Sequence, residues 1–230
     1  RSEERPFNPG HFHDGWKMYW AYSGGDTADD GSHQLDIARM LAGDPAAPRA
    51  VHASGGHVAF QDDREVPDTL VATYEFDSLM MTFELSQWSP YMQKTPGQIR
   101  NTDMFPAWQQ NATRIELYGT KEMMYVGRHG GGWQAFGPGG RVTSEHFGRE
   151  ESERHRDNFL ACMRTRKNPI ADIEIGHHSA LLVHLANLGV RLGGARFAFD
   201  TASEQIPGNP EANSLLRRTY RPPFTVPESV

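Results

Sequence analysis

The sequence has one cysteine, Cys162, among its 230 residues. A single thiol excludes an internal disulfide and any zinc site built on several thiolates. Long apolar runs are missing too, since no stretch approaches the ~18 consecutive apolar residues of a membrane-spanning helix. Basic residues are in the minority, with 23 Lys and Arg against 29 Asp and Glu and a formal net charge of −6. This balance argues against nucleic-acid binding, which usually needs a basic face.

The glycine fingerprint of dinucleotide-binding proteins is also missing. In that fingerprint, Gly-x-Gly-x-x-Gly joins a strand to a helix whose N-terminus binds a pyrophosphate. The nearest glycine cluster, Gly130-Gly131-Gly132, is followed by Trp133 and a turn-rich stretch instead of a helix. We therefore predict that this chain by itself binds NAD or NADP weakly or not at all. The compartment stays open between cytoplasmic and exported, because any leader peptide would lie upstream of Arg1.

The composition is typical of a soluble protein, with 37% apolar residues and a mean hydropathy of −0.63. A chain of this length can bury a substantial core. We expect a single domain over 1–230 that comprises a leading segment with an aromatic cluster over 1–23, a helix over 24–42, a sheet region over 50–148, and helices with a tail over 150–230. Helices and antiparallel strands in this order predict an α+β fold.

Residue patterns place the main elements of this fold. Alternating apolar and polar residues predict strands over 70–76, 79–85, 114–120 and 123–126. Helices are expected over 150–166 and 173–192, with inward-facing stripes formed by Phe159, Cys162 and Met163 in the first and by Ile173, Leu181, Leu185, Leu188 and Leu192 in the second. An exposed sheet face rich in Met and aromatic residues is expected from Tyr74, Met80, Met81 and Phe83. Because large exposed apolar patches drive association, we expect a dimer or tetramer.

The helix expected over 24–42 carries the first candidate site. Asp29, His33 and Asp36 lie three or four residues apart and would share one side of this helix. A carboxylate one turn from an imidazole can fix the tautomer of the ring and raise its basicity, as a proton-transferring His requires. The alternative is a helix N-terminus capped by an Asp, with a His on the polar surface.

Aromatic side chains are dense in the segment Trp16-Lys17-Met18-Tyr19-Trp20-Ala21-Tyr22. Such rings can stack on the C–H faces of a sugar, or they can belong to the core. Lys17 favours the first interpretation, because a cation among aromatic residues near Asp29 and His33 is an awkward choice for a structural role. His11 and His13 could hold a metal ion together with Asp29 and His33, but a polar loop is the simpler interpretation for this His-x-His pair.

Several short motifs follow one another along the whole chain. The first half contains Asn8-Pro9, His11-Phe12-His13, Trp16-Lys17-Met18-Tyr19-Trp20, and the stretch from Gly24-Gly25-Asp26 to His33 and Asp36. The second half contains His155-Arg156-Asp157-Asn158-Phe159, Pro169 with Asp172, His184-Leu185-Ala186-Asn187, Arg191-Leu192-Gly193, Glu211-Ala212-Asn213 and Tyr220-Arg221-Pro222. In this order the motifs resemble the C-terminal domain of the glucose–fructose oxidoreductase, inositol dehydrogenase and MocA (Gfo/Idh/MocA) family.

The resemblance implies an open, mostly antiparallel β-sheet with helices packed on one face, and another face that often packs in oligomers. Family members begin with a Rossmann domain that binds NAD(H) or NADP(H) and contributes a catalytic Lys in a Glu-Lys-Pro motif, and this chain contains neither. His33 matches the catalytic acid/base and Asp29 the carboxylate that assists it. Trp16, Lys17 and Asp26 would lie near the sugar.

The resemblance therefore implies the substrate-binding and catalytic domain of a nicotinamide-dependent sugar or polyol oxidoreductase. The missing nucleotide-binding domain would be supplied in cis or in trans. One turn departs from the family pattern, since Gly119-Thr120-Lys121-Glu122 stands where members have Gly-Thr-Lys-Gly. Two alternatives remain: a stand-alone relative that binds a carbohydrate or performs non-redox, metal-assisted acid/base chemistry, and a purely structural assembly domain.

Overall fold

A computed structural model describes residues 6–148, 152–217, 220, 222–223 and 225–226. The helical elements are the 3-10 segments η1 (Pro9–His11), η2 (His13–Met18), η3 (Trp108–Gln110) and η4 (Pro138–Gly140) and the α-helices α1 (Gly25–Ala28), α2 (Asp30–Leu41), α3 (Ser152–Thr165), α4 (Ile173–Arg191) and α5 (Pro210–Leu215). The strands are β1 (Ala50–Gly56), β2 (Thr69–Glu75), β3 (Met80–Ser86), β4 (Arg114–Tyr118), β5 (Met123–Gly127), β6 (Trp133–Phe136), β7 (Val142–His146) and β8 (Phe197–Ala198). The four expected strands and both expected long helices are confirmed, while the expected helix start at Glu150 lies outside the described residues.

The elements divide into two compact units, which are described separately. Unit 1 comprises Arg1–Ser32, Pro45–Trp88 and Ala180–Val230, and unit 2 comprises His33–Asp44 and Ser89–Ser179. Each unit contains a four-stranded antiparallel sheet and helical segments, so the α+β class is confirmed. The strands lie in two sheets rather than in one.

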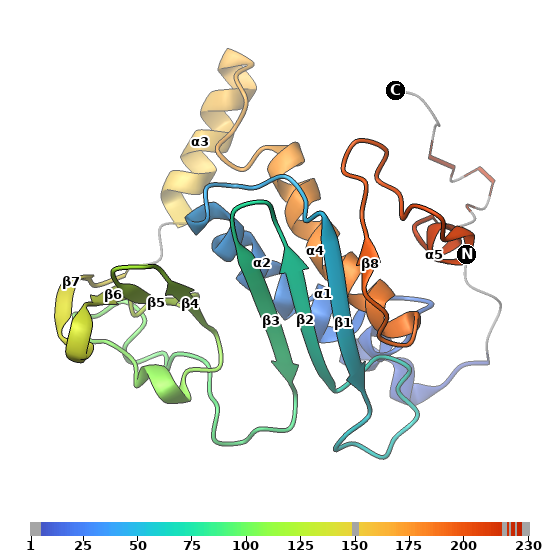
Figure 1. The fold of residues 1–230 in the computed structure, drawn as a ribbon, viewed down its shortest axis with the longest axis horizontal. Helices are drawn as coiled ribbons and strands as arrows, with labels where there is room; N and C mark the ends of the chain where they lie inside the picture. The colour runs from blue at the N-terminus through green and yellow to red at the C-terminus, as the bar shows by residue number, and fades with distance from the viewer. Residues whose placement is uncertain (1–5, 149–151, 218–219, 221, 224, 227–230) are drawn as a thin grey trace. The chain divides into compact units, whose positions relative to one another are not determined.

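The sheet of unit 1 has the strand order β3-β2-β1-β8, and every neighbouring pair is antiparallel (Figure 1). In β2, the side chains of Leu70, Ala72 and Tyr74 are fully buried, whereas Val71 between them is 45% exposed. Successive side chains of a strand point to opposite faces. One face of this sheet therefore forms the core of the unit, and the other is exposed.

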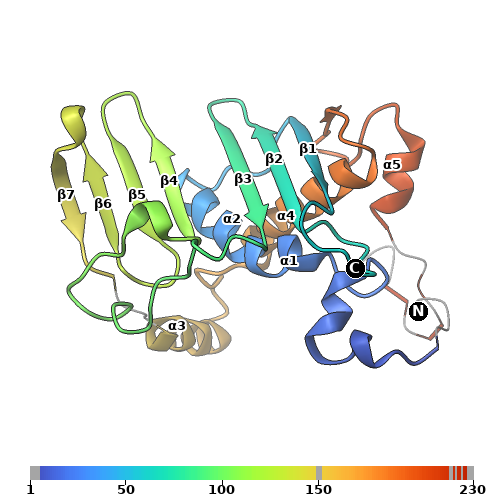
Figure 2. The ribbon, with the colours of Figure 1, turned by 90° about the horizontal axis from the view of Figure 1, so that it is seen from below.

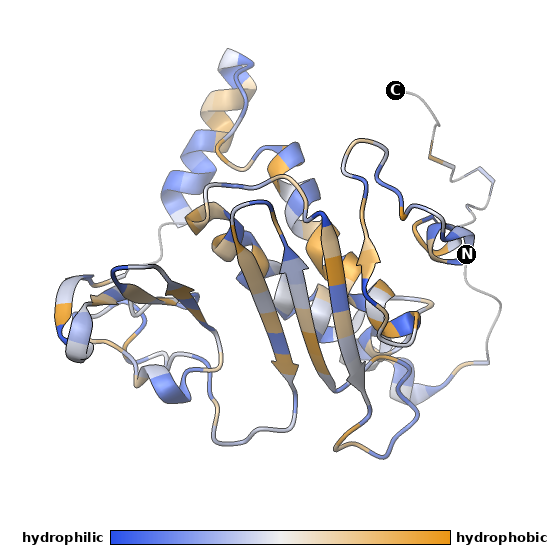
Figure 3. Ribbon diagram, viewed as in Figure 1, coloured by the Kyte–Doolittle hydropathy of each residue, from blue (hydrophilic) through white to orange (hydrophobic). Residues whose placement is uncertain are grey.

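Residues 180–191 of α4 cover the buried face of this sheet (Figure 2). The buried Tyr74 hydroxyl donates to the carbonyl oxygen of Leu182 at 2.9 Å. A Cβ atom on Gly189 would lie 2.9 Å from the Cβ of Ala53, so glycine lets the helix approach β1 closely. The apolar residues of α4 gather where the helix passes behind the sheet (Figure 3). Leu185 and Leu188 are buried as expected.

The apolar sheet face that we expected to be exposed is divided between the two faces. Met81 lies opposite Tyr74 and Phe83 opposite Ala72, so all four side chains belong to the buried face. Tyr74 is fully buried and Phe83 is 9% exposed, whereas Met80 is 69% exposed. Because successive side chains of a strand point to opposite faces, Met80 lies on the exposed face, whereas Met81 and Phe83 lie on the buried face with Tyr74. The expectation of an exposed side chain is therefore wrong for Tyr74 and Phe83.

The sheet of unit 2 is a meander with the order β4-β5-β6-β7. Aromatic rings pack in this unit, with the Trp108 and Tyr125 ring centroids 5.7 Å apart. Strands β6 and β7 were not expected, because the surrounding glycines indicated turns. Those glycines do form the connecting turns, where Gly130 and Gly139 have φ angles of 77° and 76°.

Helix α3 has no buried residue. Phe159 and Met163 are 54% and 55% exposed, and Ile173 at the start of α4 is 86% exposed. The expectation that these apolar side chains face inwards is therefore wrong. An amphipathic pattern identifies the apolar face of a helix, but it does not say what covers that face. No helix among the described residues has the length and apolar composition needed to cross a membrane.

Candidate functional site

The segment expected to form one helix over 24–42 is broken at Asp29. Helix α1 ends at Ala28 and α2 begins at Asp30, and Asp29 between them has φ −82° and ψ −86°, outside the helical range. Asp29 therefore does not continue the helical face that carries His33 and Asp36, and the expectation of one shared face is wrong for this residue.

The Asp29 carboxylate binds Lys17 on η2. The Lys17 Nζ atom donates to Asp29 Oδ2 at 2.6 Å, and the two side chains are 27% and 45% exposed. Trp16, the neighbour of Lys17, is 41% exposed, whereas Tyr19 is buried. Tyr19 thus belongs to the core, whereas Trp16 exposes part of its ring to solvent, and the stacking of Trp16 on a sugar stays a prediction.

Asp26 on α1 lies near this ion pair. Burial raises the pKa of its carboxyl, and the charges of Asp30 and Asp29 raise it further. A hydrogen bond from Gln87 and the charge of Lys17 act in the opposite direction. Since an interaction between charges weakens with distance, these effects place Asp26, Asp29 and Lys17 in one electrostatic neighbourhood.

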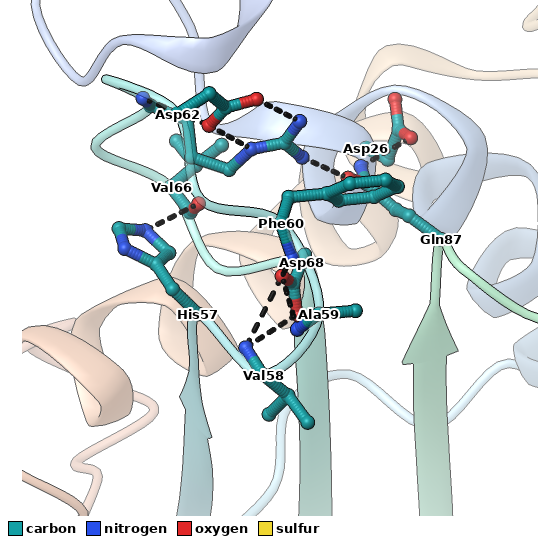
Figure 4. Close-up of polar contacts among 10 residues, drawn as sticks. Asp26, His57, Val58, Ala59, Phe60, Asp62, Val66, Asp68 and Gln87 are labelled. Atoms are coloured by element: carbon teal, nitrogen blue, oxygen red, sulfur yellow. Dashed lines mark hydrogen bonds and ion pairs between the residues drawn. The ribbon is translucent and has the colours of Figure 1, made fainter.

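Asp26 is the end of a chain of polar contacts that sequence reasoning missed (Figure 4). Gln87 Nε2 donates to Asp26 Oδ2 at 2.5 Å, and Gln87 Oε1 accepts a hydrogen bond of 2.6 Å from Arg64 Nη1. Arg64 in turn binds both carboxylate oxygens of Asp62, at 2.7 and 2.6 Å. Gln87 and Asp26 are far apart in the sequence and share no motif, and only the charge cluster Asp62-Asp63-Arg64 could have drawn attention to this loop.

The loop over 57–68, which carries Asp62 and Arg64, is organised by Asp68. The Asp68 side chain is fully buried and accepts hydrogen bonds from the backbone N–H groups of Val58, Ala59 and Phe60 (Figure 4). It also accepts one from the Thr69 hydroxyl. Burial alone would raise the pKa of Asp68, but these donors lower it well below its usual range. A buried, charged Asp68 thus fixes the backbone that presents Arg64.

His33 lies on α2, in the part of the helix that belongs to unit 2, and its side chain is exposed. The Asp29 carboxylate, which was expected to assist His33, contacts Lys17. Of the five residues singled out from the sequence, the structure thus groups Trp16, Lys17, Asp26 and Asp29 in unit 1.

The metal site considered from the sequence does not form. Over the described parts of the chain, no three His, Cys, Asp or Glu side chains are grouped in a way that could hold a metal ion. The His11 ring instead packs on Tyr19 with centroids 3.8 Å apart, and its Nε2 atom lies 3.6 Å from Asp63 Oδ2.

The two described sheets also do not fit a dinucleotide cofactor bound in the Rossmann manner. A dinucleotide site of the Rossmann type needs parallel strands and a glycine-rich turn into a helix. All pairs of neighbouring strands in the two described sheets are antiparallel. What the site of unit 1 does offer is two carboxylates and an ammonium group beside an exposed indole, which is a set of donors and acceptors suited to hydroxyl groups.

Several solved structures have a similar fold. They include the WlbA dehydrogenase from Bordetella pertussis in complex with NADH and UDP-GlcNAcA (19% identity, TM-score 0.50), the UDP-N-acetylglucosamine 3-dehydrogenase GnnA from Acidithiobacillus ferrooxidans (17%, 0.54) and an NAD-binding protein from Listeria innocua (16%, 0.56). These similarities cover 84%, 81% and 81% of this chain but only 51%, 51% and 50% of those chains. The chain thus spans about half the length of the solved structures that it matches. No curated protein sequence matches it.

Two family descriptions match the sequence itself. Residues 2–125 match the family described as "GFO/IDH/MocA C-terminal domain", and residues 143–226 match that described as "Oxidoreductase family, C-terminal alpha/beta domain". The first match alone covers more than half of the chain, and the second continues it through α3, α4 and α5. This chain therefore belongs to the Gfo/Idh/MocA oxidoreductase family, as its C-terminal domain.

Proposed function

We propose that this chain supplies the substrate-binding and proton-transferring half of a nicotinamide-dependent sugar or polyol oxidoreductase. Binding of NAD or NADP is assigned to a nucleotide-binding domain outside this chain, because the described strands offer no parallel dinucleotide site. The observation that carries the proposal is the 2.6 Å contact between Lys17 and Asp29, two of the residues that match the family pattern, together with the exposure of Trp16, the sequence neighbour of Lys17. Family membership supports the reaction class.

Oxidation of a secondary alcohol requires a group that accepts the hydroxyl proton. Histidine is the side chain best suited to exchange a proton near neutrality, and His33 is exposed on α2. Asp29, which the family pattern assigns to assist the acid/base, is held in place in unit 1 by its contact with Lys17. Lys17 and Asp26 would bind sugar hydroxyls, and Trp16 would stack on the C–H face of the ring.

The substrate is proposed as a sugar or polyol. Two of the structures with a similar fold carry or act on UDP-sugars, so UDP-N-acetylglucosamine is the first compound to test. Glucose and myo-inositol complete a panel that covers a sugar nucleotide, a free sugar and a polyol, each with NAD⁺ and NADP⁺.

The decisive experiment compares His33→Asn with the wild type in the full-length enzyme. Asparagine retains the size and one hydrogen bond but cannot accept a proton near neutral pH. Turnover should fall by roughly 10²–10⁴-fold, as expected for loss of a general base. The thermal midpoint should change little, because His33 is exposed. Asp29→Asn should lower turnover in the same direction but by less.

His52→Asn is a matched control, since His52 is also exposed and belongs to β1, which carries none of the proposed site residues. The control should retain wild-type turnover. Unchanged turnover in His33→Asn would remove His33 from the mechanism. A fall in thermal midpoint, with residual activity that follows the folded fraction, would assign His33 a structural role instead.

A further inference from the structure

We propose that Gln87 and Arg64 are positioning residues that hold the Asp26 carboxylate in the orientation in which it accepts a hydroxyl group of the substrate. This inference rests on the proposed function, in which Asp26 contacts the sugar or polyol. It adds Arg64 of the loop over 57–68 and Gln87, which directly follows β3, to a site otherwise built from η2 and α1.

The geometry leaves Gln87 one orientation. A guanidinium group only donates hydrogen bonds, so the side-chain oxygen of Gln87 must face Arg64 Nη1, at 2.6 Å. Its NH₂ group must then face Asp26, where Nε2 lies 2.5 Å from Oδ2. Because the carboxylate only accepts, the order donor–acceptor–donor–acceptor is satisfied from Arg64 to Asp26 in one arrangement alone.

Arg64 is itself held firmly. Two hydrogen bonds to the oxygens of Asp62 fix the plane of the guanidinium group, which lies 4.3 Å from the centre of the Phe60 ring. The Arg64 side chain is 11% exposed. Phe60 lies in the stretch whose N–H groups bind buried Asp68. The arrangement is therefore rigid before any substrate arrives, which is what a positioning group requires.

The consequence for Asp26 is a fixed direction of its remaining acceptor. Gln87 occupies Oδ2, so Oδ1 is the oxygen that would accept a substrate hydroxyl (Figure 4). The negative charges acting on Asp26 include those of Asp29 and Asp30, and the positive charges of Lys17 and Arg64 oppose them. This excess of negative charge favours hydroxyl donors and disfavours a carboxylate or phosphate at this position. The subsite is thus suited to the neutral, hydroxyl-rich part of a sugar or polyol.

The test uses the full-length enzyme, the active compound of the panel named above, and two substitutions of Gln87. Gln87→Leu removes both hydrogen bonds. Gln87→Glu has the same shape and retains the contact with Arg64, but it places a second carboxylate against Asp26. Gln61→Leu is the control, because Gln61 is an exposed glutamine of the same loop. Wild type, variants, Asp26→Asn and the double variant Asp26→Asn/Gln87→Leu are compared by KM, kcat and the pH dependence of kcat/KM.

We expect both Gln87 variants to raise KM about tenfold, the typical effect of losing a hydrogen bond to a charged group, with kcat nearly unchanged. Removing the Gln87 donor removes an interaction that lowers the pKa of Asp26, so the acidic limb of the kcat/KM profile should move to higher pH. The double variant should have nearly the KM of Asp26→Asn, since Gln87 acts only through Asp26. The Gln61→Leu control should match the wild type.

The inference is overturned if Asp26→Asn raises KM while both Gln87 variants leave it unchanged, or if the effects of Asp26→Asn and Gln87→Leu simply add. Either result leaves the proposed function standing. If Asp26→Asn itself leaves KM unchanged, then Asp26 does not contact the substrate, and that part of the proposed site fails together with the inference. If Gln61→Leu changes kcat and KM as much as the Gln87 variants do, the effects come from general damage to the loop. This result would also overturn the inference.

Discussion

Replacing Asp68 by Asn removes the charge that holds the loop between β1 and β2. The Asp68 oxygens accept hydrogen bonds from Val58 N at 3.0 Å, Ala59 N at 3.0 Å, Phe60 N at 2.9 Å and Thr69 Oγ1 at 2.7 Å. Asparagine keeps one carbonyl oxygen for some of these donors, but its NH₂ group cannot accept any of them. Alanine removes both carboxylate oxygens, so the three backbone N–H groups lose the acceptor that they have in the wild type.

The expected cost follows from these contacts. A hydrogen bond to a charged group contributes about 1.5–3 kcal/mol and a neutral one about 1 kcal/mol. Asp68→Asn should therefore lower the free energy of unfolding by about 2 kcal/mol, and Asp68→Ala by about 4 kcal/mol, because buried donors then lose their partner. For a chain of this size, about 2 kcal/mol corresponds to a fall in thermal midpoint of roughly 4–8 °C.

The effect should depend on pH in a defined direction. The pKa of Asp68 is lower in the folded protein than in the unfolded chain, where it is about 3.9. The charge therefore stabilises the fold fully above about pH 4, and this contribution is lost as the pH falls through the folded-state value. The free energy of unfolding of the wild type should thus exceed that of Asp68→Asn by the full difference near pH 7 and by a smaller difference near pH 3.

Thermal unfolding followed by circular dichroism measures the difference in stability between the wild type and each variant. Hydrogen exchange of the Val58, Ala59 and Phe60 amides shows whether the loss of stability is centred on this loop. These three amides should exchange faster in both variants, since they lose the acceptor that protects them. Asp77→Asn in the exposed β2–β3 turn is the control and should change stability by less than about 0.5 kcal/mol. A difference in stability that is the same near pH 7 and near pH 3, or unchanged exchange of the three amides, would refute the assigned role of Asp68.

Three further predictions concern unit 2, the cofactor and assembly. Arg39 is 1% exposed, and its Nη1 atom donates to Ile175 O at 3.0 Å and to Ser179 Oγ at 2.8 Å. Arg39→Met should therefore lower the free energy of unfolding, measured in urea, by about 3 kcal/mol, and a loss below about 1 kcal/mol would contradict this. Calorimetry should find weak or no binding of NAD(H) and NADP(H) to this chain alone, and micromolar affinity for either would mean that it contains a dinucleotide site after all. Light scattering should find the full-length protein as a dimer or tetramer, since apolar residues of α3 such as Phe159 and Met163 are half exposed; a uniform monomer at micromolar concentration is the opposing result.

The sequence by itself determined the elements whose pattern is local. Alternation over residues 70–85 specified the β2–β3 hairpin, and the apolar period specified α3 and α4. The order of short motifs was sufficient to identify the family, because each motif follows the chain and needs no knowledge of its folding.

Only the tertiary structure decided which side chains meet. The break at Asp29 separates two helices that the pattern joins, and it is the contact with Lys17, not with His33, that the carboxylate makes. Asp26 and Gln87 lie on different elements, and no local period connects them. Likewise, apolar stripes were predicted on both α3 and α4, but Leu185 and Leu188 of α4 are buried whereas Phe159 and Met163 of α3 are exposed, because burial depends on what packs against a helix and not on the helix alone. Short-range propensity sets the elements, whereas the positions of the polar groups that recognise a ligand follow from long-range packing.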